Sequence, residues 1–115
     1  GPAILYKIPL ARIELVDGDT PITADYKVLL SDDNTSFDLS NSVKFYPVET
    51  TESEIEWISD NEGVAKVNGN TVEAVSNGTA TLTAKPCDGV DEQTMTVKVE
   101  IEGIDETYYV EVKTK

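Results

Sequence analysis

Histidine is absent from this chain and cysteine occurs once, so the side chains of many catalytic sites are missing or scarce. Without histidine, no Ser/His or Cys/His pair can form, and the sequence has no glycine-rich phosphate-binding motif. Cys87 has no partner for an intrachain disulfide, so the fold must rest on packing and hydrogen bonds. Its neighbours Pro86 and Asp88 predict a turn, and a nearby carboxylate disfavours a reactive thiolate. We therefore expect that the protein is not an enzyme.

Basic residues are also scarce: nine Lys and Arg stand against 22 Asp and Glu, which gives a net charge of −13 at pH 7. Such a negative field repels the phosphates of nucleic acids and the headgroups of anionic lipids. No apolar run approaches the roughly 20 residues that a membrane span needs, and no signal segment is recognisable. We therefore expect neither a nucleic-acid partner nor direct membrane insertion.

The length of 115 residues predicts a single domain, large enough to bury a core without metals or disulfides. Gly1-Pro2 resembles the residues that a protease leaves behind when it cuts off a tag. We therefore expect residues 3–115 to form the domain itself.

Short runs of alternating apolar and polar residues fill the chain, and Gly, Pro, Asn and Asp separate them. No segment has the apolar spacing of three and four residues that indicates a helix. The pattern predicts an all-β protein. The expected strands cover residues 4–10, 13–15, 26–30, 37–45 with a polar interruption, 55–57, 65–67, 71–75, 79–84, 95–101 and 108–112.

Residues 55–84 form the most informative stretch, because they combine short alternating strands with two Asn-Gly turns and the one tryptophan. Ile55 and Trp57 have one parity while Glu54 and Glu56 have the other, which predicts a half-buried strand. Asn-Gly turns are typical of antiparallel hairpins. The residues expected to point inward are Ile55, Trp57, Ala65, Val67, Val72, Ala74, Ala80, Leu82 and Ala84.

This stretch also resembles a known family. The segments WISDNEGVAKV (57–67), NTVEAV (70–75) and GTATLTA (78–84) follow the order, spacing and residue types of the bacterial immunoglobulin-like domain, group 2. Pro47, shortly before the tryptophan strand, is also similar to the family pattern. The chain is longer than a minimal member at both ends, in residues 3–30 and 103–115, which we interpret as extra edge strands or joints to neighbouring domains.

The resemblance implies an immunoglobulin-like sandwich of two antiparallel sheets, with extra edge strands at the N- and C-termini. It also implies a non-catalytic structural or adhesive module of a bacterial surface or secreted protein. Such a module would act as a spacer or bind a host-surface protein or carbohydrate, with neighbouring domains of the same parent chain as further partners. The family also occurs in phage particles, so a capsid, tail or fibre domain is the alternative. The expected location is extracellular or on the bacterial cell surface, or in a virion.

One sequence pattern favours a metal ion. The run D-x-N-x-S-x-D has the oxygen spacing that opens several calcium-binding loops, although position six is Phe37 rather than glycine and position twelve is Val43 rather than glutamate. The alternative is an acidic surface loop. A calcium-stabilised adhesive module is therefore a further hypothesis, and no other cofactor is expected. The candidate calcium loop consists of Asp32, Asn34, Ser36 and Asp38.

Three apolar or aromatic side chains have the parity opposite to the inward residues. They are Tyr46, Ile58 and Tyr109. Scattered exposed apolar residues are normal, whereas a contiguous patch would mark an interface. The sequence alone leaves both possibilities open.

Overall fold

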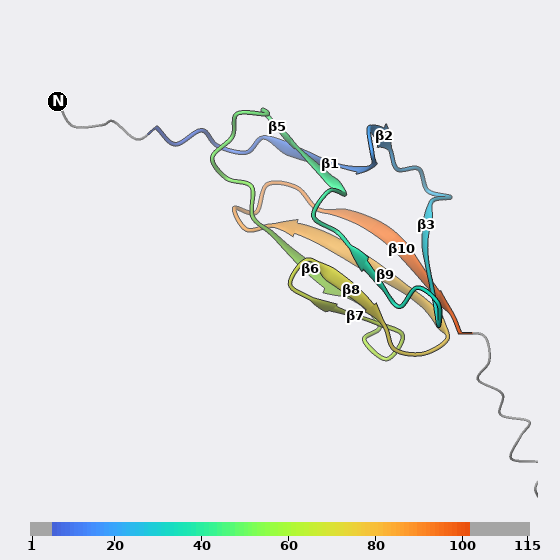
Figure 1. Ribbon diagram of the computed structural model, residues 1–115. Coiled ribbons are helices and arrows are strands. Elements are labelled where there is room, and N and C mark those ends of the chain that lie inside the picture. The colour runs from blue at the N-terminus through green and yellow to red at the C-terminus, as the bar shows by residue number, and fades with distance from the viewer. Residues whose placement is uncertain (1–5, 102–115) are drawn as a thin grey trace, which may run out of the picture.

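A computed structural model describes residues 6–101 of the chain. These residues form ten β-strands and no helix, so this part of the chain has no helix that could span a membrane (Figure 1). The all-β prediction is confirmed. The expected strand at 108–112, and with it a C-terminal edge strand, lies outside the described residues.

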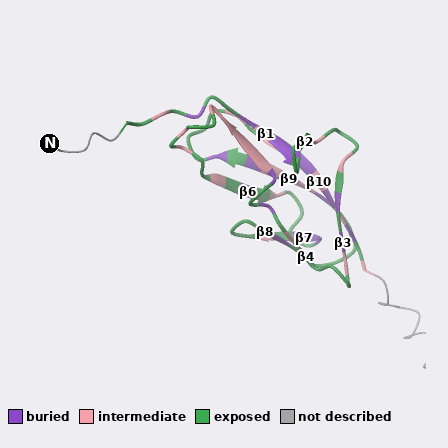
Figure 2. Cartoon of the chain, turned by 45° about the horizontal axis from the view of Figure 1, so that its top comes forward, coloured by how far each residue is buried: buried purple, intermediate pink, exposed green. Residues whose placement is uncertain are grey.

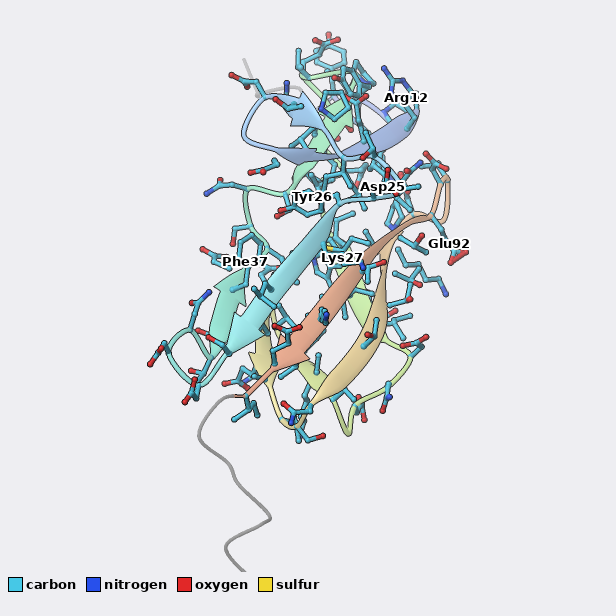
Figure 3. The ribbon with its side chains drawn as sticks, turned by 90° about the vertical axis from the view of Figure 1, so that its right-hand side faces the viewer. Arg12, Asp25, Tyr26, Lys27, Phe37 and Glu92 are labelled. Carbon is cyan, nitrogen blue, oxygen red and sulfur yellow. The ribbon has the colours of Figure 1, made fainter. Side chains whose placement is uncertain are left out.

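The larger sheet has four strands in the order β3-β10-β9-β6. They are β3 (Lys27–Ser31), β10 (Gln93–Glu100), β9 (Gly78–Pro86) and β6 (Ile55–Ser59). The pairs β10 with β9 and β9 with β6 are antiparallel, whereas β3 runs parallel to β10. Figure 3 shows β3 and β10 side by side, with Tyr26 and Lys27 at the start of β3. The prediction of purely antiparallel sheets is thus wrong for β3.

A smaller antiparallel sheet has the order β4-β8-β7. Its strands are β4 (Ser36–Asp38), β8 (Thr71–Ala74) and β7 (Ala65–Asn68). Between β7 and β8, Gly69 has φ of 64°, which a glycine adopts without the steric penalty of a side chain. The predicted Asn-Gly hairpin at this position is confirmed.

The third sheet has the order β2-β1-β5, again antiparallel. Its strands are β1 (Arg12–Asp17), β2 (Thr20–Pro21) and β5 (Val43–Tyr46). The first predicted strand, 4–10, is not a strand over its described residues. Ile8 instead bonds to the 50–51 segment: Thr51 N donates to Ile8 O at 3.0 Å, and Ile8 N donates to the side-chain Oγ1 of Thr51 at 3.0 Å. Pro9, which lacks an N–H donor, lies in this irregular segment.

The expected single strand over 37–45 is two strands in two different sheets, so that prediction is corrected. β4 pairs with β8 on one side, and β5 pairs with β1 on the other. Residues 39–42 join the two ladders, because Leu39 N donates to Asn70 O and Ser42 O accepts from Val16 N. The turn within this linker closes when Ser42 N donates to Leu39 O at 3.0 Å. The interruption therefore separates two strands, whereas the sequence predicts a polar interruption within one.

Together, the sheets form an immunoglobulin-like sandwich, as predicted. In one layer the order is β1, then β5 together with β4, then β8 and β7, which corresponds to the order A-B-E-D of that fold. In the other layer the order is β10, β9 and β6, which corresponds to G-F-C. β3 adds an N-terminal edge strand to the second layer. Trp57 lies on the strand where immunoglobulin domains carry their buried tryptophan.

The core lies between these layers, and Figure 2 shows buried residues along the strands of both. All nine residues expected to point inward are buried or half-buried, and Trp57 is only 7% exposed. Val64, also 7% exposed, is a core residue that the sequence pattern did not mark. Outside residues 55–84, the core includes Ile13, Leu15, Val28, Leu30, Leu39, Met95, Val97 and Val99.

Candidate functional site

A cleft of about 320 Å³ opens between the two layers, on the side where β6 is the edge strand of the larger sheet. A second hollow adjoins it and is lined in addition by Val67 and Gly69, next to the edge strand β7. Both hollows share the side chains of β6, so we treat them as one cleft. Its apolar lining comes mainly from Leu39, Val43, Phe45, Ile55, Trp57 and Val67.

The alternation of β6 places two of these side chains. Ile55 and Trp57 point between the layers while Glu56 and Ile58 point outward. Opposite Trp57 in the ladder lies Ala84 of β9, a small residue that leaves room for the indole ring. The tryptophan therefore belongs both to the core and to the cleft wall.

Carboxylates surround one end of the cleft. Glu52, Glu54 and Asp88 lie around Cys87, and Lys7 Nζ is 3.5 Å from Glu52 Oε1. Cys87 has an exposed thiol in a turn, as predicted: its N–H donates to Glu54 O, and Gly89 N donates to Pro86 O. With three carboxylates and one lysine, this rim favours positively charged groups over negatively charged ones.

The candidate calcium loop is divided between a turn and a strand. Asp32 follows β3 in a turn closed by backbone hydrogen bonds between Ser31 and Asn34. Ser36 and Asp38 lie at the two ends of β4, which is extended and paired with β8. Within residues 6–101, no group of three or more His, Cys, Asp or Glu is placed to hold a metal ion. Calcium binding stays a prediction that the geometry does not strengthen.

Asp38 has a local partner instead. Its carboxylate accepts hydrogen bonds from Ser40 Oγ at 2.7 Å and from Ser40 N at 2.9 Å. The hydrogen bond from the Ser40 hydroxyl, and to a smaller extent the one from the Ser40 backbone N–H, lowers the pKa of Asp38 below its ordinary value. The carboxylate thus stabilises the turn that follows β4.

The outward aromatic and apolar residues do not form one patch in the described part of the chain. Tyr46 is half-buried, its hydroxyl donates to Glu14 Oε1 at 3.2 Å, and the Arg12 guanidinium lies 3.9 Å from its ring centroid. Arg12 is labelled in Figure 3, at the sheet of β1, β2 and β5. Ile58 is 43% exposed on the opposite sheet, and Tyr109 lies outside the described residues.

Comparison with protein-family models finds no match for this chain, and comparison with curated proteins finds none either. The resemblance of residues 55–84 to the group 2 bacterial immunoglobulin-like domain therefore remains a prediction. Because no relative assigns a role to any residue, the candidate site rests on the geometry of the cleft.

The sequence pattern does not reveal the cleft. Ile55, Trp57 and Val67 are expected in the core, because alternation shows which side of a strand faces the other layer but not whether that layer covers it. One usable signal is the acidic content of the flanking segment ETTESE, residues 49–54, which directly precedes an apolar strand. A run of charged residues directly before an apolar strand is typical of a boundary between core and solvent.

Proposed function

We propose that this chain is a non-catalytic immunoglobulin-like module of a bacterial surface or secreted protein, and that it acts as a spacer carrying tension between neighbouring domains. The surface setting rests on the family resemblance. The mechanical role rests on one observation: the chain enters the sandwich at one end and leaves β10 at the opposite end (Figure 1).

The parallel pairing of β3 with β10 supports this role. The ladder joins five residue pairs, from Thr96 with Lys27 to Glu100 with Ser31. If the two ends of the domain are pulled apart, the force on the N-terminal side passes through β1, which pairs with β5, before it reaches β3. β3 and β10 are then drawn in opposite directions along their length. All of the ladder hydrogen bonds then stretch together instead of breaking one after another. Each contributes about 1 kcal/mol net, so simultaneous rupture sets a higher barrier than sequential rupture.

Single-molecule pulling tests the proposal, because rupture under force reports the unfolding rate. Handles attached at the N- and C-termini load β3 and β10 in shear. We expect a single rupture peak for the domain, at a force that rises with pulling rate.

A matched control changes only the direction of the load. Asp33→Cys in a Cys87→Ser background places one handle in the exposed turn after β3, next to the end of β10. Pulling between this handle and the C-terminus peels the ladder from one end, so we expect a lower rupture force at the same pulling rate. Equal forces in the two geometries would refute a mechanical role for the ladder.

A further inference from the structure

We propose that the free edge of β6, together with the cleft beside it, binds an extended basic segment of a partner protein by strand addition. In this binding mode, backbone hydrogen bonds supply affinity, and pockets for alternate side chains supply specificity. The proposal does not depend on the mechanical role.

The hydrogen-bonding groups of β6 alternate between its partner and its free side. Glu54 O accepts from Cys87 N at 3.0 Å, and Asp60 N donates to Thr81 O at 3.1 Å, so the even-numbered residues face β9. In an antiparallel ladder, the residues between them point their N–H and C=O groups the other way. Ile55 and Trp57 thus present these groups to the free edge, and no partner for them is found within residues 6–101.

The other end of this edge is closed. Ser59 Oγ donates to Ala65 O at 2.7 Å, which ties the end of β6 to the start of β7. The free part of the edge therefore begins at Ile55 and coincides with the cleft. β6 has no proline, bulge or inward-pointing charge, which are devices that commonly protect an edge strand from pairing.

Side-chain parity defines the partner sequence. An added strand would place alternate residues opposite Ile55 and Trp57, above the apolar cleft, and the residues between them opposite Glu54 and Glu56, which are exposed. Apolar and basic residues in strict alternation satisfy both sides. Charge also disfavours a second copy of this chain as the occupant, because each copy carries a net charge of −13.

A labelled peptide of alternating lysine and valine, eight residues long, is the probe. A peptide with glutamate in place of lysine is its control. We expect saturable binding of the lysine peptide to the full chain by fluorescence anisotropy, a change in the emission of Trp57, and at least about tenfold weaker binding of the glutamate peptide. Equal binding of both peptides, or no binding of either, would overturn the proposal.

Two substitutions at one position isolate the backbone contribution. Ile55→Pro replaces the isoleucine side chain with the proline ring and removes the outward N–H, whereas Ile55→Ala shortens the side chain to a methyl group and keeps that N–H. The ladder to β9 does not use this N–H, so proline is compatible with the edge position. We expect Ile55→Pro to bind the lysine peptide at least about fivefold more weakly than Ile55→Ala. Equal affinities would rule out strand addition.

A third variant keeps the test decisive if Ile55→Pro fails to fold. Glu54→Gln removes one carboxylate of the rim and should weaken the lysine peptide about two- to fivefold at low salt, with the difference shrinking as salt rises. Sedimentation of the full chain alone completes the design. Concentration-dependent self-association that Ile55→Pro abolishes would identify a second copy as the occupant and overturn the proposal.

Discussion

Gly78, at the start of β9, should tolerate no side chain. Its φ is 143°, a backbone conformation that L-residues rarely adopt. A Cβ atom built there would lie 2.7 Å from Cγ2 of Val64, a buried core residue. Gly78→Ala therefore combines backbone strain with overpacking against the core.

The two costs can be sized separately. Holding a non-glycine residue in a sparsely populated φ region costs about 1 to 3 kcal/mol. An extra methyl group forced into a packed core costs about 1 to 3 kcal/mol. We expect Gly78→Ala to lower the free energy of unfolding by about 2 to 6 kcal/mol. Gly69→Ala is the matched control: φ is 64° but nothing lies within 4 Å of the added Cβ, so about 1 to 2 kcal/mol is expected.

Urea unfolding followed by circular dichroism measures both variants, with an unchanged m-value as the check for two-state behaviour. The double variant Gly78→Ala with Val64→Ala tests the contact directly. Its cost should fall short of the sum of the single costs by about 0.5 kcal/mol or more. A Gly78→Ala variant no less stable than Gly69→Ala, or strict additivity with Val64→Ala, would refute the reasoning.

Three further predictions concern the tryptophan, pH and calcium. Trp57→Ala should cost about 3 to 5 kcal/mol because the indole fills the core, whereas Ile58→Ala, on the exposed face of the same strand, should cost under about 0.5 kcal/mol; chemical unfolding should rank them in this order. Burial, and to a smaller extent the negative charge of Asp17, raises the pKa of Tyr26. As pH rises, the hydroxyl proton of Tyr26 is therefore lost from the unfolded chain before it is lost from the folded one. Stability should therefore fall as pH rises above about 10, and Tyr26→Phe should reduce the fall measured by urea midpoints at increasing pH. If the candidate calcium loop binds calcium, excess calcium should raise the melting temperature above its value in chelator, and identical melting curves would exclude it.

Much of the fold could be predicted from residue parity. A strand has a side-chain period of two, so Ala80, Leu82 and Ala84 identify the inward side of β9 without knowledge of its partners. Asn68-Gly69 identified the hairpin of β7 with β8 for the same local reason, whereas the second Asn-Gly turn, Asn77-Gly78, joins β8 to β9 of the other sheet and forms no hairpin. These features depend on a few neighbouring residues, which a sequence displays directly.

Features that depend on distant partners could not be predicted. Nothing local in Val28 or Leu30 indicates that β3 runs parallel to β10, about 70 residues later in the chain. The division between β4 and β5 likewise follows from which strands flank each half, β8 or β1. The cleft has the same origin, since Trp57 borders it only because no further strand of residues 6–101 pairs with the outer edge of β6.

Amide hydrogen exchange along β6 tests the account most directly, because it reports both the register of this strand and the state of its edge. In the full chain alone, the amides of Glu56 and Ile58, which face β9, should exchange slowly, and those of Ile55 and Trp57 should exchange much faster. Addition of the lysine peptide should slow the exchange of Ile55 and Trp57. Slow exchange at all four amides without peptide would contradict the open edge, and fast exchange at Glu56 and Ile58 would contradict the fold itself.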